Sequence, residues 1–254
     1  MSFVVAFPVL IRAGRPTRFL RAIACVFGLA LSAPAVAQVT WDADTGTSGP
    51  QDGSGTWSTV DANWWNGSTD VVWPNLSTST ATIGANSGAA GTITVDGSLT
   101  LNAITFNAPG SGSYTVTGGT LGFAGTSPTI TANTAATIGS DITSGVGLTK
   151  NGTGTLTLSG SISNTTGGVS FSQGEVTLTG TLTNTSTSTL AVGSSNGGTL
   201  TIAGGSMSTT GAGARSVVIA GGAGRSGTIA VTGGTLSPVG MLISEDSGGN
   251  GVFT

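Results

Sequence analysis

A short pattern recurs along the chain and limits its possible folds more than any other feature does. The pattern reads Gly, any residue, an apolar residue, any residue, an apolar residue, any residue, Gly. Six copies begin at Gly91, Gly112, Gly154, Gly174, Gly198 and Gly227. The intervals are 21, 42, 20, 24 and 29 residues, and because 42 is twice 21 we expect a degenerate copy around Ile130 to Ile138. A unit repeated at this period is typical of solenoids and related arrays.

Each copy is predicted to form a half-buried β-strand. Apolar residues at every second position lie on one face of an extended chain, while Thr and Ser suit the opposite, solvated face. The flanking glycines permit the positive φ of a tight corner. We therefore expect inward side chains at Leu156, Leu158, Val176, Leu178, Leu200 and Ile202, and outward ones at Thr157, Thr177 and Thr201.

Stacking of these units predicts an all-β fold of the parallel β-helix type. The few inward aliphatics of one turn cannot form a core alone, but neighbouring turns about 4.8 Å away join them into continuous columns. An antiparallel β-sandwich or propeller is the alternative, since short strands with glycine turns also suit those folds. The nearly constant period favours the solenoid.

Residues 38–83 differ from the repeats in composition. They contain five of the ten acidic residues and all five tryptophans, which are Trp41, Trp57, Trp64, Trp65 and Trp73. A solenoid end needs a cover for its apolar column and strand edges, so this segment is predicted to be an N-terminal cap. Exposed indole rings could also bind sugars, which makes Trp57, Trp64 and Trp65 possible ligand contacts.

Residues 1–37 are predicted to be a cleaved signal peptide. Four arginines between residues 12 and 21 precede the apolar run Ala22–Leu31, and Ala35-Val36-Ala37 provides a small-x-small cleavage site. An uncleaved anchor is the alternative, although ten apolar residues are too few to span a bilayer. The expected organisation is a signal peptide (1–37), a Trp-rich cap (38–83) and β-solenoid repeats (84–254).

The composition excludes several kinds of chemistry. The chain has no His, and its one Cys, Cys25, lies in the predicted leader, so cysteine nucleophiles, Cys-based zinc sites and disulfides are excluded from the exported protein. Residues 38–254 contain three basic and ten acidic side chains, a net charge of −7. That charge argues against a nucleic-acid partner. We expect no cofactor and no metal.

Two segments match ligand-binding motifs only in part. Asp42 and Asp44, with Gly46 and Asp52 beyond them, could offer oxygens to calcium, but no third acid lies at loop spacing, so a solvated turn is favoured. The run Gly222–Gly227 matches the dinucleotide-binding glycine pattern and resembles a calcium-binding repeat with Ser226 in place of its Asp. It continues into an expected strand rather than the helix that a pyrophosphate site needs.

Polysaccharide cleavage is the main competing activity, and it needs two carboxyl groups facing one another. The acids of the repeat region are Asp96, Asp141, Glu175, Glu245 and Asp246, and the basic residues are Lys150, Arg215 and Arg225. Asp96 is the sixth residue of its copy and Glu175 the second of its own, so these two do not fall in one column. Adjacent strand residues such as Glu245 and Asp246 would point to opposite faces. No catalytic residue is therefore assigned.

The repeat resembles a known family. Leu148-Thr-Lys150-Asn-Gly-Thr-Gly154-Thr-Leu-Thr-Leu-Ser-Gly160, followed by Gly167-Gly168 and Gln173-Gly-Glu-Val-Thr-Leu178, looks like the autotransporter-associated β-strand repeat of bacterial surface proteins. The segments Thr40-Trp-Asp42, Gly55-Thr-Trp57 and Ala62-Asn-Trp64 resemble the start of such passenger proteins. The resemblance covers about residues 40–254. It implies a right-handed β-helix displayed as an adhesin or surface fibre, and it assigns no catalytic residues.

The resemblance also implies a region that this sequence does not show, because such proteins carry a C-terminal translocator barrel or a sorting tail. Residues Gly251-Val252-Phe253-Thr254 match the first four positions of the repeat. We therefore expect the chain to be truncated, with further copies and a translocator or sorting region in the full-length protein.

The expected function is that of a secreted or surface-displayed, non-enzymatic structural or adhesin-like protein, located in the extracellular space or at the outer-membrane surface. Its outward Thr, Ser and Asn side chains would contact a glycan or matrix ligand multivalently. The alternative is a carbohydrate-binding or polysaccharide-degrading surface module centred on the Trp-rich cap.

Overall fold

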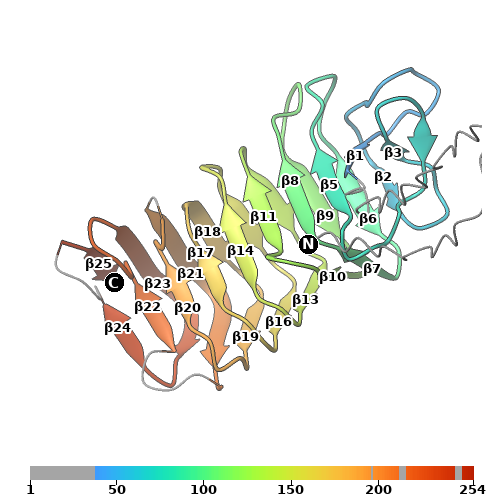
Figure 1. Ribbon diagram of the computed structural model, residues 1–254. Coiled ribbons are helices and arrows are strands. Elements are labelled where there is room, and N and C mark those ends of the chain that lie inside the picture. Colours follow the sequence, from blue (N-terminus) through green and yellow to red (C-terminus); the bar gives the residue numbers. More distant parts are fainter. Residues whose placement is uncertain (1–37, 196, 212–215, 244–247) are drawn as a thin grey trace, which may run out of the picture. The chain divides into compact units, whose positions relative to one another are not determined.

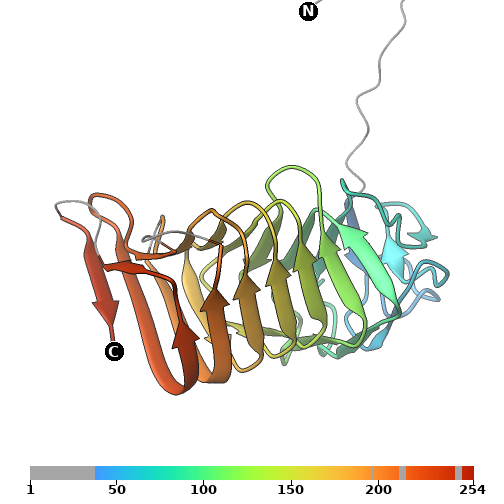
Figure 2. The ribbon, with the colours of Figure 1, turned by 90° about the horizontal axis from the view of Figure 1, so that it is seen from below.

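The computed structural model describes residues 38–254 except 196, 212–215 and 244–247. The predicted signal peptide therefore lies outside the described residues. Every regular element in the described part of the chain is a β-strand, and no helix there is long and apolar enough to cross a membrane. The strands follow one another around a coil and stack turn upon turn (Figures 1 and 2).

The strands of the stack form three columns, and neighbours within a column are parallel. The first column contains β1 (Gln38–Trp41), β5 (Thr80–Ile83), β8 (Ala103–Phe106), β11 (Thr129–Ala132), β14 (Leu148–Asn151), β17 (Val169–Phe171), β20 (Leu190–Val192), β22 (Val217–Ile219) and β24 (Met241–Ile243).

The second column contains β2 (Gly55–Trp57), β6 (Thr92–Val95), β9 (Tyr114–Thr117), β12 (Ala136–Ile138), β15 (Leu156–Leu158), β18 (Gly174–Leu178), the first halves of β21 (Gly198–Thr209) and β23 (Ser226–Ser237), and β25 (Asn250–Phe253). The third column contains β7 (Ser98–Leu101), β10 (Thr120–Phe123), β13 (Asp141–Ser144), β16 (Ser161–Asn164), β19 (Thr181–Asn184) and the second halves of β21 and β23.

This arrangement is a β-solenoid of about seven turns, and it confirms the predicted fold class. The antiparallel sandwich or propeller is wrong for this chain. Antiparallel pairing in the described residues is confined to β1 with β3 (Trp64–Trp65) and β3 with β4 (Asp70–Val71). A parallel stack is possible here because each turn returns the chain to the same column one strand further along.

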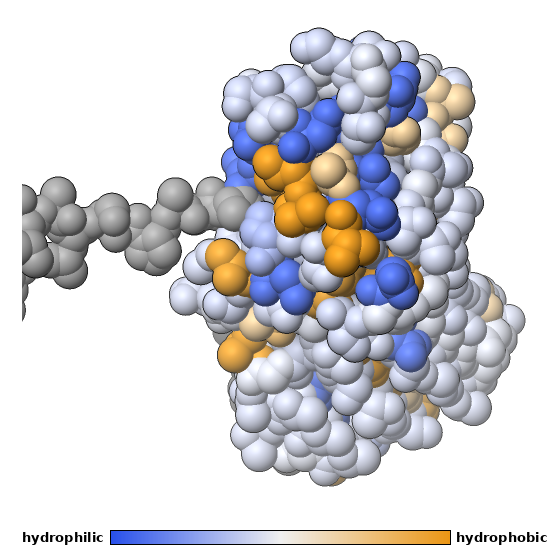
Figure 3. Space-filling model, turned by 90° about the vertical axis from the view of Figure 1, so that its right-hand side faces the viewer, coloured by the Kyte–Doolittle hydropathy of each residue, from blue (hydrophilic) through white to orange (hydrophobic). Residues whose placement is uncertain are grey.

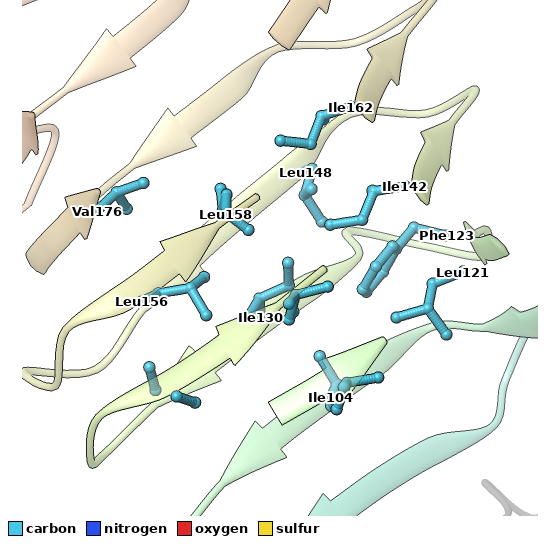
Figure 4. Close-up of a cluster of buried hydrophobic side chains, with 14 of the residues drawn as sticks. Ile104, Leu121, Phe123, Ile130, Ile142, Leu148, Leu156, Leu158, Ile162 and Val176 are labelled. Atoms are coloured by element: carbon cyan, nitrogen blue, oxygen red, sulfur yellow. The ribbon is translucent and has the colours of Figure 1, made fainter. Parts of the chain in front are cut away.

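The core runs along the inside of the stack and follows the predicted alternation. All six side chains expected to point inward are at most 4% exposed, whereas Thr157, Thr177 and Thr201 are half-buried. In the third column Leu121, Ile142 and Ile162 are register partners, and Figure 4 shows them among the buried aliphatics of the other columns. The apolar side chains of successive turns therefore form one continuous interior.

The degenerate copy expected in the 42-residue gap is β12. Its Ala136 and Ile138 pair with Tyr114 and Val116 on one side, and with Leu156 and Leu158 on the other. Ile130 belongs to β11 in the first column, so the copy is shorter than the segment predicted. In the same way Gly251 pairs with Gly227, which places β25 in the predicted register of the next copy.

Close backbone approach explains the glycines at the corner between the second and third columns. A Cβ atom at Gly180 would collide with the carbonyl oxygen of Gly160 in the turn below. Gly152, at another corner, has a φ of +82°, a conformation that residues with a side chain rarely adopt. Glycine is therefore required where successive corners stack most tightly.

Candidate functional site

Four tryptophans of the cap form a buried aromatic cluster. The ring centroids of Trp57 and Trp64 are 4.8 Å apart, those of Trp57 and Trp73 are 4.9 Å apart, and those of Trp41 and Trp64 are 5.4 Å apart. All four side chains are at most 1% exposed. The indole of Trp73 also donates a hydrogen bond to the carbonyl of Thr100 in the edge strand β7 at 3.1 Å. The cluster therefore covers the first turn, as expected of a cap.

The three tryptophans predicted as possible ligand contacts differ in their exposure. Trp57 and Trp64 are 0% exposed, so their rings pack inside the cap and do not offer a surface to a sugar. Trp65 alternates with Trp64 along β3 and is half-buried. A ligand-binding role for Trp65 stays a prediction.

Asp52 ties the cap to the first turns of the stack. Its carboxylate accepts hydrogen bonds from the backbone N–H groups of Ala85 at 2.9 Å, Ser87 at 2.8 Å and Gly88 at 3.2 Å, and from the Tyr114 hydroxyl at 2.8 Å. Burial alone would raise the pKa of Asp52, but these donors outweigh burial and lower the pKa. Asp52 is therefore surrounded by donors, which suits a structural carboxylate and not a calcium ligand.

The carboxyl groups of Asp42 and Asp70 are neighbours in the cap. Oδ1 of Asp42 accepts hydrogen bonds from the backbone N–H groups of Asp44 at 3.0 Å and Gln51 at 3.1 Å. Oδ2 of Asp42 and Oδ1 of Asp70 are shielded from solvent, and neither has a hydrogen-bond partner among the described residues. Burial raises the pKa of Asp42, the two N–H donors oppose the rise, and the neighbouring Asp70 adds to it.

The segment around Asp42 and Asp44, considered from the sequence as a possible calcium site, therefore forms a turn. Asp44 is exposed and accepts hydrogen bonds from Gly46 N–H and Thr47 Oγ1. Among the residues described, no group of three or more His, Cys, Asp or Glu side chains could hold a metal ion. Sequence reasoning missed the Asp42–Asp70 pair because a gap of 28 residues separates them and only the antiparallel return of the cap brings them together.

Lys150 is a buried cation inside the stack. It is 2% exposed, and its Nζ donates to the carbonyl oxygens of Gly152 and Gly154 at 2.8 Å and of Gln173 at 2.7 Å. Burial lowers the pKa of Lys150 to about 8, although the negative charge of Glu175 acts in the opposite direction. The three acceptors match the three donors of an ammonium group, so Lys150 fastens two successive corners to each other.

Threonine forms a continuous ladder on the outside of the second column. Six residues in consecutive turns are register partners, namely Thr92, Thr115, Thr137, Thr157, Thr177 and Thr201. Their side chains are half-buried or exposed. Parallel pairing places successive hydroxyls about 4.8 Å apart. In the third column Thr143, Ser163, Thr183 and Ser208 form a second series of register partners.

An open groove of about 280 Å³ follows the corner between the second and third columns. Its lining consists of the glycine backbone and of hydroxyl side chains, Thr179, Thr181, Ser206 and Thr235 among them. No aromatic side chain lines it. The groove offers hydroxyl and backbone groups to a ligand and no ring for stacking.

The three repeat-region acids that the structure describes do not form a catalytic pair. Asp141 pairs with Thr120 in the third column, Glu175 pairs with Thr199 in the second, and Asp96 follows β6 in a different turn. Glu245 and Asp246 lie outside the described residues, as does Arg215.

The glycine run near residue 224 has no helix after it. The chain continues into the strand β23 at Ser226, and Arg225 donates to the carbonyl of Gly221 at 3.0 Å. The expected continuation of this run into a strand is confirmed.

Part of the chain is similar to a known autotransporter adhesin. A stretch of 127 residues, 47% of the chain, is 38% identical to the adhesin BmaC autotransporter of Brucella suis biovar 1 (strain 1330). The match spans 4% of that relative's length. No family model and no solved structure matches the chain. Similarity to an autotransporter adhesin, together with the β-solenoid, is consistent with an autotransporter passenger.

Proposed function

We propose that the chain is a non-enzymatic, adhesin-like passenger region displayed at the outer-membrane surface. It would contact an extracellular glycan or matrix ligand through the threonine ladder on the outside of its second column. The observation that carries the proposal is the run of six register-matched threonines on the second column. Identical groups repeated along a rigid stack let many weak contacts act together.

The similarity to an autotransporter adhesin supports this proposal. The physical character of the surface supports it as well. Threonine hydroxyls both donate and accept hydrogen bonds, and the regular spacing of the ladder offers the same contact in each turn. A long ligand could therefore bind without a deep pocket.

A bead assay tests the proposal. Beads carrying the exported chain are added to cultured epithelial cells and to surfaces coated with collagen or laminin, and retention under flow is measured. The ladder variant replaces Thr157, Thr177 and Thr201 by Val, which keeps the β-branched shape and removes the hydroxyls. The matched control carries Thr143→Val, Ser163→Ala and Thr183→Val in the third column.

Retention of wild-type beads, lost in the ladder variant and kept in the control, is the expected result. Unchanged retention of the ladder variant would remove the ladder from the proposal. Equal loss in both variants would do the same, because it would reflect general surface polarity. Failure of wild-type beads to bind any of these surfaces would overturn the adhesin-like function.

Carbohydrate recognition is the second candidate, and two observations favour it. Trp65 is the partly exposed indole of the cap, and the corner groove presents hydroxyl groups. Binding on a glycan array that disappears with Trp65→Ala would favour this candidate. Trp64→Ala cannot serve as that test, because Trp64 is fully buried and its loss would damage the cap.

A further inference from the structure

The outer end of the cap carries an apolar patch that the fold does not use. Figure 3 views this end and shows hydrophobic surface in its middle with hydrophilic surface beside it. The cap residues that contribute large exposed apolar side chains are Val60 at 77%, Leu76 at 54% and Val72 at 43%. We call these three side chains the cap patch.

The patch sits on well-anchored backbone. The turn that carries Val60 is held by Ser58 Oγ, which accepts hydrogen bonds from the backbone N–H groups of Val60 at 3.2 Å and Asp61 at 2.9 Å. Val72 directly follows β4. Leu76 donates its backbone N–H to Ser79 Oγ at 3.1 Å and accepts from the Ser79 N–H at 2.9 Å. The three side chains are therefore displayed at fixed positions.

Negative charge adjoins the patch and positive charge does not. Asp61 follows Val60 directly, and Asp70 lies two residues before Val72. Residues 38–83 contain five Asp and no Lys or Arg. Asp61 is exposed, and its carboxylate accepts a hydrogen bond from the Ser58 hydroxyl at 2.8 Å. The cap therefore presents apolar surface beside the exposed carboxylate of Asp61, which no lysine or arginine of the cap neutralises.

This combination selects one kind of partner. Two caps meeting face to face would bring like charges together, which opposes association of two copies. An anionic lipid surface would be repelled for the same reason. A peptide with apolar side chains on one face and Lys or Arg beside them satisfies both features, since apolar burial supplies affinity and the Asp61 carboxylate supplies charge pairing.

We propose that the cap patch binds a cationic amphipathic peptide segment, with Val60, Val72 and Leu76 contacting its apolar face and Asp61 facing its basic side chains. This activity goes beyond the proposed adhesin-like function, because it uses the cap and not the threonine ladder. Either proposal can fail without the other.

Fluorescence anisotropy tests the proposal. The probe is a short labelled peptide of leucine and lysine with the two residue types on opposite helix faces, and the comparison peptide has glutamate in place of lysine. The patch variant is Val72→Ser with Leu76→Ser. The matched control is Val146→Ser, since Val146 is 49% exposed but lies in the stack. Asp61→Asn tests the charge.

The patch variant is expected to weaken binding of the lysine peptide by about tenfold, and Asp61→Asn by about two- to fivefold. Val146→Ser should leave binding unchanged, and binding should weaken as salt rises. Thermal unfolding of each variant is measured first, so that loss of fold is distinguished from loss of contact.

Several outcomes would overturn the proposal. They are equal binding of the glutamate peptide, equal loss with Val146→Ser, absence of lysine-peptide binding by the wild-type protein at physiological salt, and concentration-dependent dimerisation that the patch variant abolishes. Preferential binding to phosphatidylcholine vesicles over the lysine peptide would point to a membrane partner and would likewise overturn it.

Discussion

The cap and the stack fill their interiors by different means. Trp64 in the cap packs against three other indoles, each in its own orientation, and no other part of the described chain repeats that arrangement. Leu158 in the stack lies between Ile138 and Leu178, which occupy the same position in adjacent turns. A contact in the cap is therefore unique, whereas a contact in the stack recurs at the same position in adjacent turns.

The difference implies different consequences of damage. Stability of a repeat stack depends on interfaces between nearest neighbours, so a defect in one turn weakens the turns on both sides. A defect in the cap exposes one end of the stack but leaves the interfaces between the remaining turns intact. Four variants test this contrast.

Leu158→Asp should have the largest effect. Burying a leucine contributes about 1.5 to 3 kcal/mol, and an unpaired buried carboxylate adds a further penalty. Hydrogen exchange should show loss of protection in β15 and in its neighbours β12 and β18. Thr157→Asp, one position away on the outer surface, should change the free energy of unfolding by less than about 0.5 kcal/mol. Similar damage from both substitutions would contradict the inward and outward assignment.

Trp64→Ala should destabilise the cap by about 3 to 5 kcal/mol, in the range of large aromatic truncations. Proteolysis and hydrogen exchange should report opening of β1 to β4, with protection of β15 to β19 retained. Loss of protection along the whole stack would show that the cap and the stack unfold together.

Asp52→Asn should have a smaller effect, about 1 to 3 kcal/mol, because an amide has one acceptor oxygen where the carboxylate has two, and so leaves buried donors unpaired. The loss should appear in residues 84 to 88 and in β9, the segments that Asp52 joins to the cap. Asp44→Asn is the matched control, since Asp44 is exposed and bonds within its own loop. Equal effects of the two would contradict the role assigned to Asp52.

Asp42→Asn should have the smallest effect, and its effect should depend on pH. The pKa of Asp42 is raised above its ordinary value of 3.8 in the folded chain, so the folded state binds this proton more tightly than the unfolded state does. The contribution of Asp42 to stability should therefore grow as pH falls through the raised pKa towards 3.8, and the Asn variant should lack that growth. Asp52, whose pKa is lowered, acts in a separate window below 3.8.

Urea-unfolding midpoints of both proteins between about pH 7 and about pH 4 measure this difference. Parallel curves for the wild type and the Asn variant would contradict the carboxyl pair described for Asp42 and Asp70.

The fold of the repeats could be predicted from the sequence because it depends on the pattern within each copy and on the interval between copies. Alternation within a copy determines which side chain points inward, and the interval between copies determines what stacks on what. These two features were enough to predict that Leu158 points inward, that Thr157 points outward, and that a degenerate copy includes Ile138. The cap was predicted as a cover from its tryptophans, but its internal geometry was not. Nothing in the local pattern distinguishes buried Trp64 from half-buried Trp65, because pairing with β1 and β4 determines which face is covered.

The polar contacts of Asp52 and Lys150 could not be predicted from the sequence, for a related reason. Asp52 and Tyr114 are separated by 62 residues and meet only after the first turns have formed. Lys150 was visible as one of three basic residues of the repeats, yet its burial follows from register with Ile130 and Phe171, which is a property of the assembled stack.

The enclosure of Lys150 has a consequence for resistance to proteolysis. Trypsin-like proteases cut after Lys or Arg, and residues 38–254 contain three such side chains, Lys150, Arg215 and Arg225. Lys150 is 2% exposed, lies within a paired strand, and has its amine held by three carbonyl oxygens. A protease of this class finds no target between residues 38 and 149, and it reaches the one at residue 150 only when the fold opens. The same contacts that fasten two corners therefore hide a scissile bond from digestion.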